Sequence, residues 1–112
     1  MIEKIVSDYL TSALPVPAYP EEPEERPEKY VLVEKTGSNK ENYINSATVV
    51  LQSYAESLYF AAELNEAVKK AMEGIAQLDD VCSAELNSDY RYTDTEAKRY
   101  RYQAVYDIVY YY

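Results

Sequence analysis

Apolar and polar residues alternate near the end of the chain with the two-residue period of a β-strand. One face of a strand over 98–110 would carry Tyr100, Tyr102, Ala104, Tyr106, Ile108 and Tyr110. The opposite face would carry Arg99, Arg101, Gln103, Val105, Asp107 and Val109. The segment is rich in aromatic and β-branched residues, which favour strands. A long strand with two amphipathic faces predicts a surface for other protein chains, and therefore an assembly protein rather than an enzyme.

Shorter patterns of the same kind predict three more strands. Residues 30–36 and 44–55 flank a polar segment, Gly37 to Asn42, which predicts a hairpin with a turn at its tip. Residues 81–92 predict a further strand, joined to the final one by a turn over 93–97. The four strands would therefore form two hairpins.

Two segments have the spacing of helices instead. Residues 1–13 carry apolar side chains at helical intervals and end before Pro15. A second helix is predicted to begin after Ser57, a suitable N-cap, and to end near Gly74, which suits the left-handed position after a helix. Its apolar stripe would consist of Ala61, Leu64, Val68, Ala71 and Ile75.

All five prolines of the chain lie in the segment 15–28, among several glutamates. Proline lacks the N–H that a sheet requires, so we predict an extended connector that does not pair within a sheet. A disordered tether is one interpretation. An ordered arm is the interpretation we favour, because the segment joins two elements of one small domain.

These elements predict a single α+β domain over residues 1–112. The expected fold is a four-stranded antiparallel sheet, made of two hairpins, with two helices packed on one face in the order α-β-β-α-β-β.

Charge and cysteine content narrow the functional classes. The formal net charge is −9, from 20 acidic and 11 basic residues, which argues against coating of DNA by clustered cations. The single cysteine, Cys82, rules out an intramolecular disulfide and is predicted to be a small buried apolar residue. No apolar run approaches the roughly 18 residues of a membrane span, so no membrane association is expected.

Catalytic chemistry has little support in the composition. The chain has no histidine and only two glycines, so His-based nucleophile activation and glycine-rich phosphate loops are absent from the sequence. Asp79 and Asp80 are adjacent, and we interpret them as solvated acids rather than a catalytic pair. We expect no enzymatic activity, no metal and no cofactor.

The 14 tyrosines require their own explanation. The run Arg99-Tyr100-Arg101-Tyr102 interleaves cations with rings, as single-strand nucleic-acid platforms do. A core and a protein interface explain the tyrosines better in an acidic chain, because one end of the side chain is apolar and the other forms hydrogen bonds.

Several segments, in this order along the chain, resemble a known family. They are a short N-terminal helix, Ala18-Tyr19-Pro20, the strand Tyr30 to Gly37, the strand Val49 to Ala55, the helix segment Ala61 to Asn65, and the closing Arg99 to Ile108. In element order and strand pattern the chain resembles the small tail-terminator and tail-completion proteins of long-tailed bacteriophages. This family has no catalytic residues to assign here.

The resemblance implies a structural virion protein of the neck and tail, assembled in the host cytoplasm. Such a protein forms a ring, expected to be hexameric, that caps the tail tube, ends tail elongation and joins the tail to the head connector. Its partners would be copies of itself, the tube protein and the connector or stopper protein, with DNA passing the lumen without specific binding. Two alternatives stay open: a head-completion or neck adaptor protein of the same virion, and a monomeric protein-binding regulator.

We predict protein–protein contacts at the acidic arm, at the tip of the first hairpin and along the final strand. The predicted interface residues are Tyr19, Glu21, Glu22, Glu24, Glu25, Ser38, Asn39, Lys40, Arg99, Arg101, Tyr102, Tyr106 and Tyr110.

Overall fold

A computed structural model describes residues 1–41, 44–93 and 99–111 of the chain. Two helices, one short 3₁₀ helix and five strands follow one another along it. They are α1 (Ile2–Ala13), β1 (Ala18–Tyr19), β2 (Tyr30–Glu41), β3 (Ile44–Ala55), α2 (Leu58–Met72), η1 (Ile75–Gln77), β4 (Val81–Arg91) and β5 (Tyr100–Tyr111).

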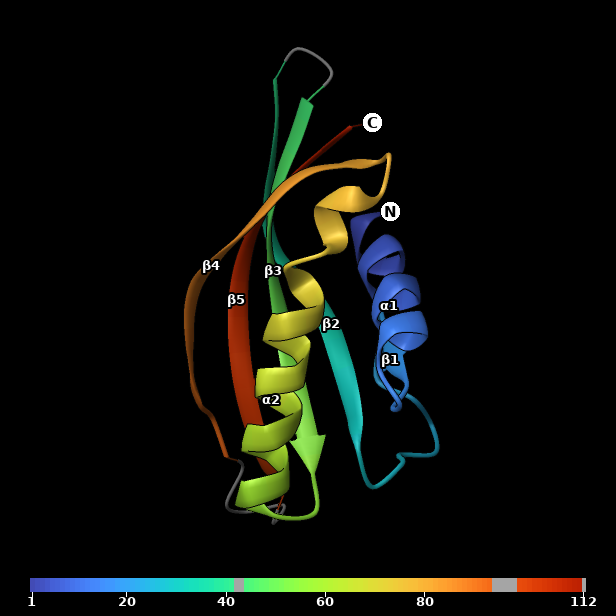
Figure 1. Cartoon of the computed structure of the whole chain (residues 1–112), viewed down its shortest axis with the longest axis vertical. Coiled ribbons are helices and arrows are strands. Elements are labelled where there is room, and N and C mark those ends of the chain that lie inside the picture. The colour runs from blue at the N-terminus through green and yellow to red at the C-terminus, as the bar shows by residue number, and fades with distance from the viewer. Residues whose placement is uncertain (42–43, 94–98, 112) are drawn as a thin grey trace.

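The strands form one mixed sheet in the order β1-β2-β3-β5-β4. Both helices lie against the same face of this sheet, as Figure 1 shows. The predicted α+β class and the two helices are therefore confirmed. The predicted four-stranded, wholly antiparallel sheet is wrong, because a fifth strand, β1, pairs with β2 in parallel.

The added strand comes from the proline-rich connector, where no pairing was expected. Ala18 and Tyr19 lie between prolines, and they pair with Val31 and Leu32 of β2. The carbonyl of Pro17 accepts from the N–H of Val31 at 3.0 Å. Proline loses its donor but keeps its acceptor, so a short pairing survives at the edge of a sheet.

The first helix is confirmed and anchors this edge. Its apolar stripe of Ile2, Val6 and Leu10 is buried. The helix ends at Ala13, before Pro15, as expected. Thr11 then uses its hydroxyl both to donate to the carbonyl of Ala18 and to accept from its N–H. The helix and β1 therefore hold each other in place.

The second helix also begins where predicted, but its end differs in detail. The Ser57 hydroxyl accepts from the N–H of Phe60 at 3.2 Å and caps the helix. Gly74 does not adopt the predicted left-handed conformation, since its φ is −96°. A Cβ at this position would lie 2.9 Å from the Tyr9 hydroxyl, which donates to the carbonyl of Ala71. A larger residue here would therefore displace the Tyr9 hydroxyl, whereas the backbone angles of Gly74 suit any residue.

The first hairpin is longer than predicted. Strand β2 continues through Glu41 with a register shift between Lys35 and Gly37, so the expected turn from residue 37 is wrong for residues 37–41. Asn42 lies outside the described residues. The distal part of this hairpin projects beyond the rest of the molecule (Figure 1).

Strands β4 and β5 match their predicted ranges to within two residues. Most of the turn expected over 93–97, together with Lys98, lies outside the described residues. The prediction that Cys82 is buried is wrong. A register shift between Val81 and Ser83 leaves Cys82 unpaired with β5 and exposed to solvent.

The core lies between the helices and the face of the sheet that they cover. Its strand residues are Val31, Val33, Ala47, Val49, Leu51, Ala104, Tyr106 and Ile108. This confirms the alternation predicted for the final strand, whose even-numbered residues turn toward the helices. Its odd-numbered residues lie on the opposite face, which neither helix covers (Figure 1).

Candidate functional site

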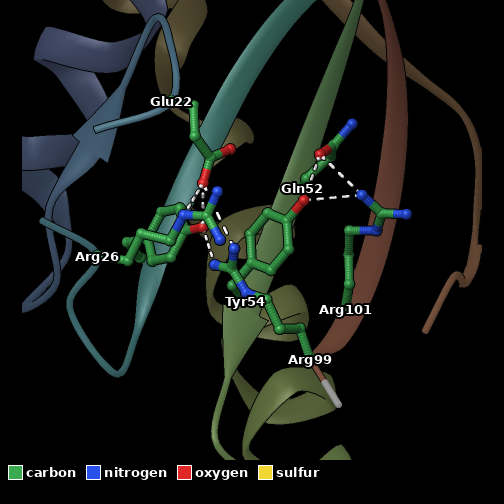
Figure 2. Close-up of polar contacts among 7 residues, drawn as sticks. Glu22, Arg26, Gln52, Tyr54, Arg99 and Arg101 are labelled. Carbon is green, nitrogen blue, oxygen red and sulfur yellow. Dashed lines mark hydrogen bonds and ion pairs between the residues drawn. The ribbon is translucent and has the colours of Figure 1, made fainter. Parts of the chain in front are cut away.

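A row of tyrosines and an arginine crosses one end of the uncovered face. Strand register places Tyr30 of β2 opposite Tyr54 of β3, and Tyr54 opposite Arg101 of β5. The N–H of Tyr92 then donates to the carbonyl of Arg101 at 2.8 Å. We call these four residues the tyrosine–arginine row, and Figure 2 shows its centre.

Two rings of the row stack on each other. The rings of Tyr30 and Tyr54 are 4.8 Å apart and inclined by only 11°, and Tyr19 of β1 packs edge-on against Tyr30 at 6.0 Å. Tyr30 and Tyr54 are 0% and 7% exposed, although no helix covers this face. Aromatic stacking thus buries this end of the sheet without a second layer.

Arg99 lies over the stacked rings and holds the acidic arm. Its guanidinium is 4.5 Å from the centre of the Tyr54 ring and 5.4 Å from that of Tyr30. It pairs with Glu22 at 3.5 Å, and Arg26 pairs with the same carboxylate at 2.9 Å (Figure 2). The ion pair between Glu22 and Arg99 therefore links the arm to the sheet, while the pair with Arg26 lies within the arm.

The Tyr30 hydroxyl completes this contact. It donates to Glu22 at 2.7 Å and accepts from Arg99. Burial, and then the hydrogen bond to Glu22, raise the pKa of Tyr30 to about 12, with Arg99 opposing them. The phenol is neutral at physiological pH, and its hydroxyl both donates to Glu22 and accepts from Arg99.

Arg101 is held differently, by neutral groups alone. Its guanidinium lies 5.4 Å from the Tyr54 ring and 4.3 Å from the Tyr92 ring. It donates to the Tyr92 carbonyl at 2.8 Å, to the Tyr54 hydroxyl at 2.7 Å and to Gln52 at 3.4 Å (Figure 2). Among the described residues, no carboxylate forms an ion pair with Arg101. The site thus contains a cation that is fixed in direction but not neutralised.

A second surface lies between α2 and the edge strand β4. It is a groove of about 670 Å³. Its lining residues are Met72, Ala84, Leu86 and Tyr106 together with the charged Glu66, Lys69, Lys70 and Glu73. Burial raises the pKa of Tyr106 to about 12. Lys69, which lines the groove, donates to Asp89 of β4 at 2.9 Å, and Asn65 donates to the same carboxylate at 3.1 Å.

These two surfaces differ in the groups that they present to a partner or ligand. Within the described ranges, no group of three or more Cys, Asp or Glu side chains is arranged to hold a metal ion. Asp79 and Asp80 are exposed, as interpreted from the sequence. The stacked rings and directed guanidinium groups are suited to carboxylates, other anions and planar groups.

The structure divides the predicted interface residues among three places. Tyr19, Glu22, Arg99 and Arg101 come together around the tyrosine–arginine row, with Glu21, Glu24 and Glu25 exposed beside it on the arm. Ser38, Asn39 and Lys40 lie exposed on the projecting hairpin. Tyr102 and Tyr110 are half-buried on the helix-covered face, and Tyr106 is 4% exposed in the protomer's own core.

Sequence reasoning missed Tyr30, Tyr54 and Tyr92 as members of the site. The first two were detectable, because they begin and end the strands of one predicted hairpin and so face each other in register. Tyr92 was not, because the turn expected over 93–97 would place it opposite residue 98, whereas the observed register places it opposite Arg101.

Comparison with known proteins adds no family assignment. No protein-family model matches the chain, and no curated protein matches it either. None of the helices in the described residues is both long and apolar enough to cross a membrane.

Proposed function

We propose that this chain is a structural subunit of a homo-oligomeric ring, in the role of a phage tail terminator. The ring, expected to be a hexamer, would cap the tail tube, end its growth and join the tail to the head connector in the virion neck. The resemblance of element order and strand pattern supports the phage assignment. The geometry of the sheet edges supports assembly.

The observation that carries the proposal is that the sheet has two different, uncovered edges. At one edge, β4 is an eleven-residue strand with no strand beyond it in the described part of the chain. Leu86 and Tyr90 on this strand are 44% and 43% exposed. Long exposed edges with apolar side chains pair readily with other chains unless something prevents it.

The other edge is equally incomplete. Strand β1 pairs with only two residues of β2, so residues 33–41 have β3 on one side and no described strand on the other. The β4 edge and the β2 edge differ, so a subunit would pair its β4 edge with the β2 edge of the next subunit. Such head-to-tail contacts close into a ring when the rotation between neighbouring subunits permits. The register shifts at Cys82 and Asn87 of β4 would limit which partner fits.

The acidic surface is compatible with a ring that encloses DNA. The net charge of −9 leaves few cations to bind phosphates, so DNA would pass the lumen without specific binding. The exposed hairpin residues Ser38, Asn39 and Lys40 would contact the tube or the connector protein.

Light scattering coupled to size-exclusion chromatography tests the proposal. We expect a mass six times the 12.9 kDa of the chain, alone or after addition of tail tubes, and annular particles in negative-stain microscopy. Leu86→Lys, at an exposed position of the edge strand, should reduce the mass toward that of one chain. Glu63→Lys, at an exposed position of α2, is the control and should leave it unchanged.

A single-chain mass under all these conditions would overturn the ring. If that monomer bound one partner protein tightly, the regulator would be the better interpretation. Association with connectors but not with tubes would favour the neck adaptor.

A further inference from the structure

The two arginines of the uncovered face differ in one respect, the presence of a counter-ion. Arg99 pairs with Glu22 of the arm. Arg101, two residues further along β5, has only hydroxyl, amide and carbonyl partners among the described residues. In a chain of net charge −9, a half-buried arginine that pairs with no carboxylate of the described residues is unusual and indicates a place for one.

Arg101 is prepared to receive such a group. Its Nε and one terminal nitrogen bind the row, while the other terminal nitrogen has no hydrogen-bond partner in the described part of the chain. The rings of Tyr54 and Tyr92 fix the plane of the guanidinium. A pre-oriented guanidinium loses less side-chain entropy when it binds a carboxylate than a mobile one does.

The arm supplies matching groups. Its side chains Glu21, Glu24 and Glu25 are exposed, and none forms an ion pair within the described ranges. Proline-rich extended segments also dock well on aromatic rings, because little conformational freedom is lost. The arm already shows this chemistry within the protomer, where Glu22 lies against Arg99 and Tyr30.

Strand order places the arm and Arg101 on opposite flanks of the same end of the sheet. The arm runs from β1 to β2, while Arg101 and Tyr92 belong to the β5–β4 side. Strand register places the stacked rings of Tyr30 on β2 and Tyr54 on β3 between these two flanks. Copies placed side by side in the same orientation would therefore bring the arm of one next to the Arg101 of another.

We propose that the acidic arm of one copy docks on Arg101 and Tyr92 of the next copy through Glu24 or Glu25. This contact would be a second fastening between neighbours, in addition to pairing at the sheet edges. It rests on the proposed ring, and it names the residues that would set the order of subunits around it.

A charge-exchange experiment on the full chain tests this contact. The readout is the protein concentration at half-assembly, measured by light scattering, with circular dichroism to verify the fold. Arg101→Glu alone and Glu24→Arg/Glu25→Arg alone should each raise that concentration about tenfold or more, and the combination should restore it to within about threefold of the original. Glu63→Arg, at an exposed position of α2, is the matched control and should have no effect.

A ring that forms unchanged in Arg101→Glu would overturn the arm contact and leave the ring proposal standing. Arg101→Glu could disturb the tyrosine–arginine row itself, so Arg101→Gln is the milder variant. If Arg101→Gln loses assembly while its fold stays intact, the result supports the contact.

If the chain is monomeric, a peptide with the sequence of residues 20–28 is added to the full protein instead. We expect chemical-shift changes at Arg101 and Tyr92 that weaken with salt and with Arg101→Gln. Binding of the peptide would retain the arm site while the ring is abandoned. No change with the peptide, or changes only with a single-stranded oligonucleotide, would overturn the arm site.

Discussion

The two faces of the sheet are buried by different means. On the covered face, aliphatic side chains such as Leu51 and Ile108 pack against α1 and α2. On the uncovered face, Tyr30 and Tyr54 are shielded by each other, by Arg99 and by the arm. Burial by the helices is mainly apolar, whereas burial by rings, guanidinium groups and a carboxylate relies on polar and charged contacts. The covered face should therefore be weakened most by loss of apolar volume, and this end of the uncovered face by loss of single polar or charged groups.

The largest effect is expected from a cavity on the covered face. Leu51→Ala removes a fully buried side chain and should lower the free energy of unfolding by about 2–5 kcal/mol. Leu32→Ala, at a half-buried position of the uncovered face, should cost about 1 kcal/mol, because less apolar area is lost. Urea unfolding at one fixed protein concentration measures both. Equal costs would contradict the difference between the faces.

Alkaline pH should weaken the fold through the two tyrosines of raised pKa. Tyr30 and Tyr106 ionise near pH 12 in the folded protein and near 10.0 when unfolded. The stabilisation that each neutral phenol gives the fold is therefore complete below pH 10 and is lost as the pH rises toward 12. This loss should lower the free energy of unfolding by roughly 2–3 kcal/mol for each residue. Unfolding free energies measured between pH 9 and 12 test this. A slope unchanged in both Tyr30→Phe and Tyr106→Phe would contradict it.

At neutral pH, removal of the Tyr30 hydroxyl should have a moderate effect. Tyr30→Phe keeps the stacked ring but deletes the hydrogen bonds with Glu22 and Arg99, which we expect to cost about 1–2 kcal/mol. Tyr19→Phe is the control, since the Tyr19 hydroxyl has no hydrogen bond among the described residues. Thermal unfolding compares the two variants, and an equal change in both would show that the hydroxyl of Tyr30 contributes nothing specific.

The smallest effect is expected at the rim of the groove on the covered face. Lys69 binds Asp89 and Glu66 near the surface, so Lys69→Gln should cost at most about 1 kcal/mol, and less at high salt. The hydrogen bond from Lys69 also lowers the pKa of Asp89. The ionised Asp89 carboxylate therefore stabilises the fold at pH values above the ordinary pKa of aspartate. This stabilisation is lost as the pH falls through the lowered pKa of Asp89. A titration of Asp89 by NMR that is identical in the variant would contradict this assignment.

Sequence patterns predicted the helices and the alternation of the final strand, because one buried face imposes a period on each element. They failed where the conformation, exposure or pairing of a single residue depends on another part of the chain. Gly74 accommodates Tyr9, Cys82 is exposed by a register shift, and the pairing of Ala18 depends on an acceptor from Pro17.

The candidate site was predicted in part, for a related reason. Arg99, Arg101 and Glu22 were recognised from their local composition. Tyr92 was not, because the hairpin of β4 and β5 was expected in a different register, which did not place Tyr92 opposite Arg101.

The position of β5 between β3 and β4 has a consequence for how the chain folds. The seam between β3 and β5 joins Ala55 to Tyr100 and Ile44 to Tyr111, so every pair along it spans a long stretch of chain. Pairings between strands so distant in sequence form slowly. The chain between β3 and β5 must first be closed into a loop, and the entropy lost in closing it is offset only afterwards by the strand pairing. Until β5 arrives, the apolar strand β3 has only its hairpin neighbour beside it, and that interval is when aggregation would compete most strongly with folding.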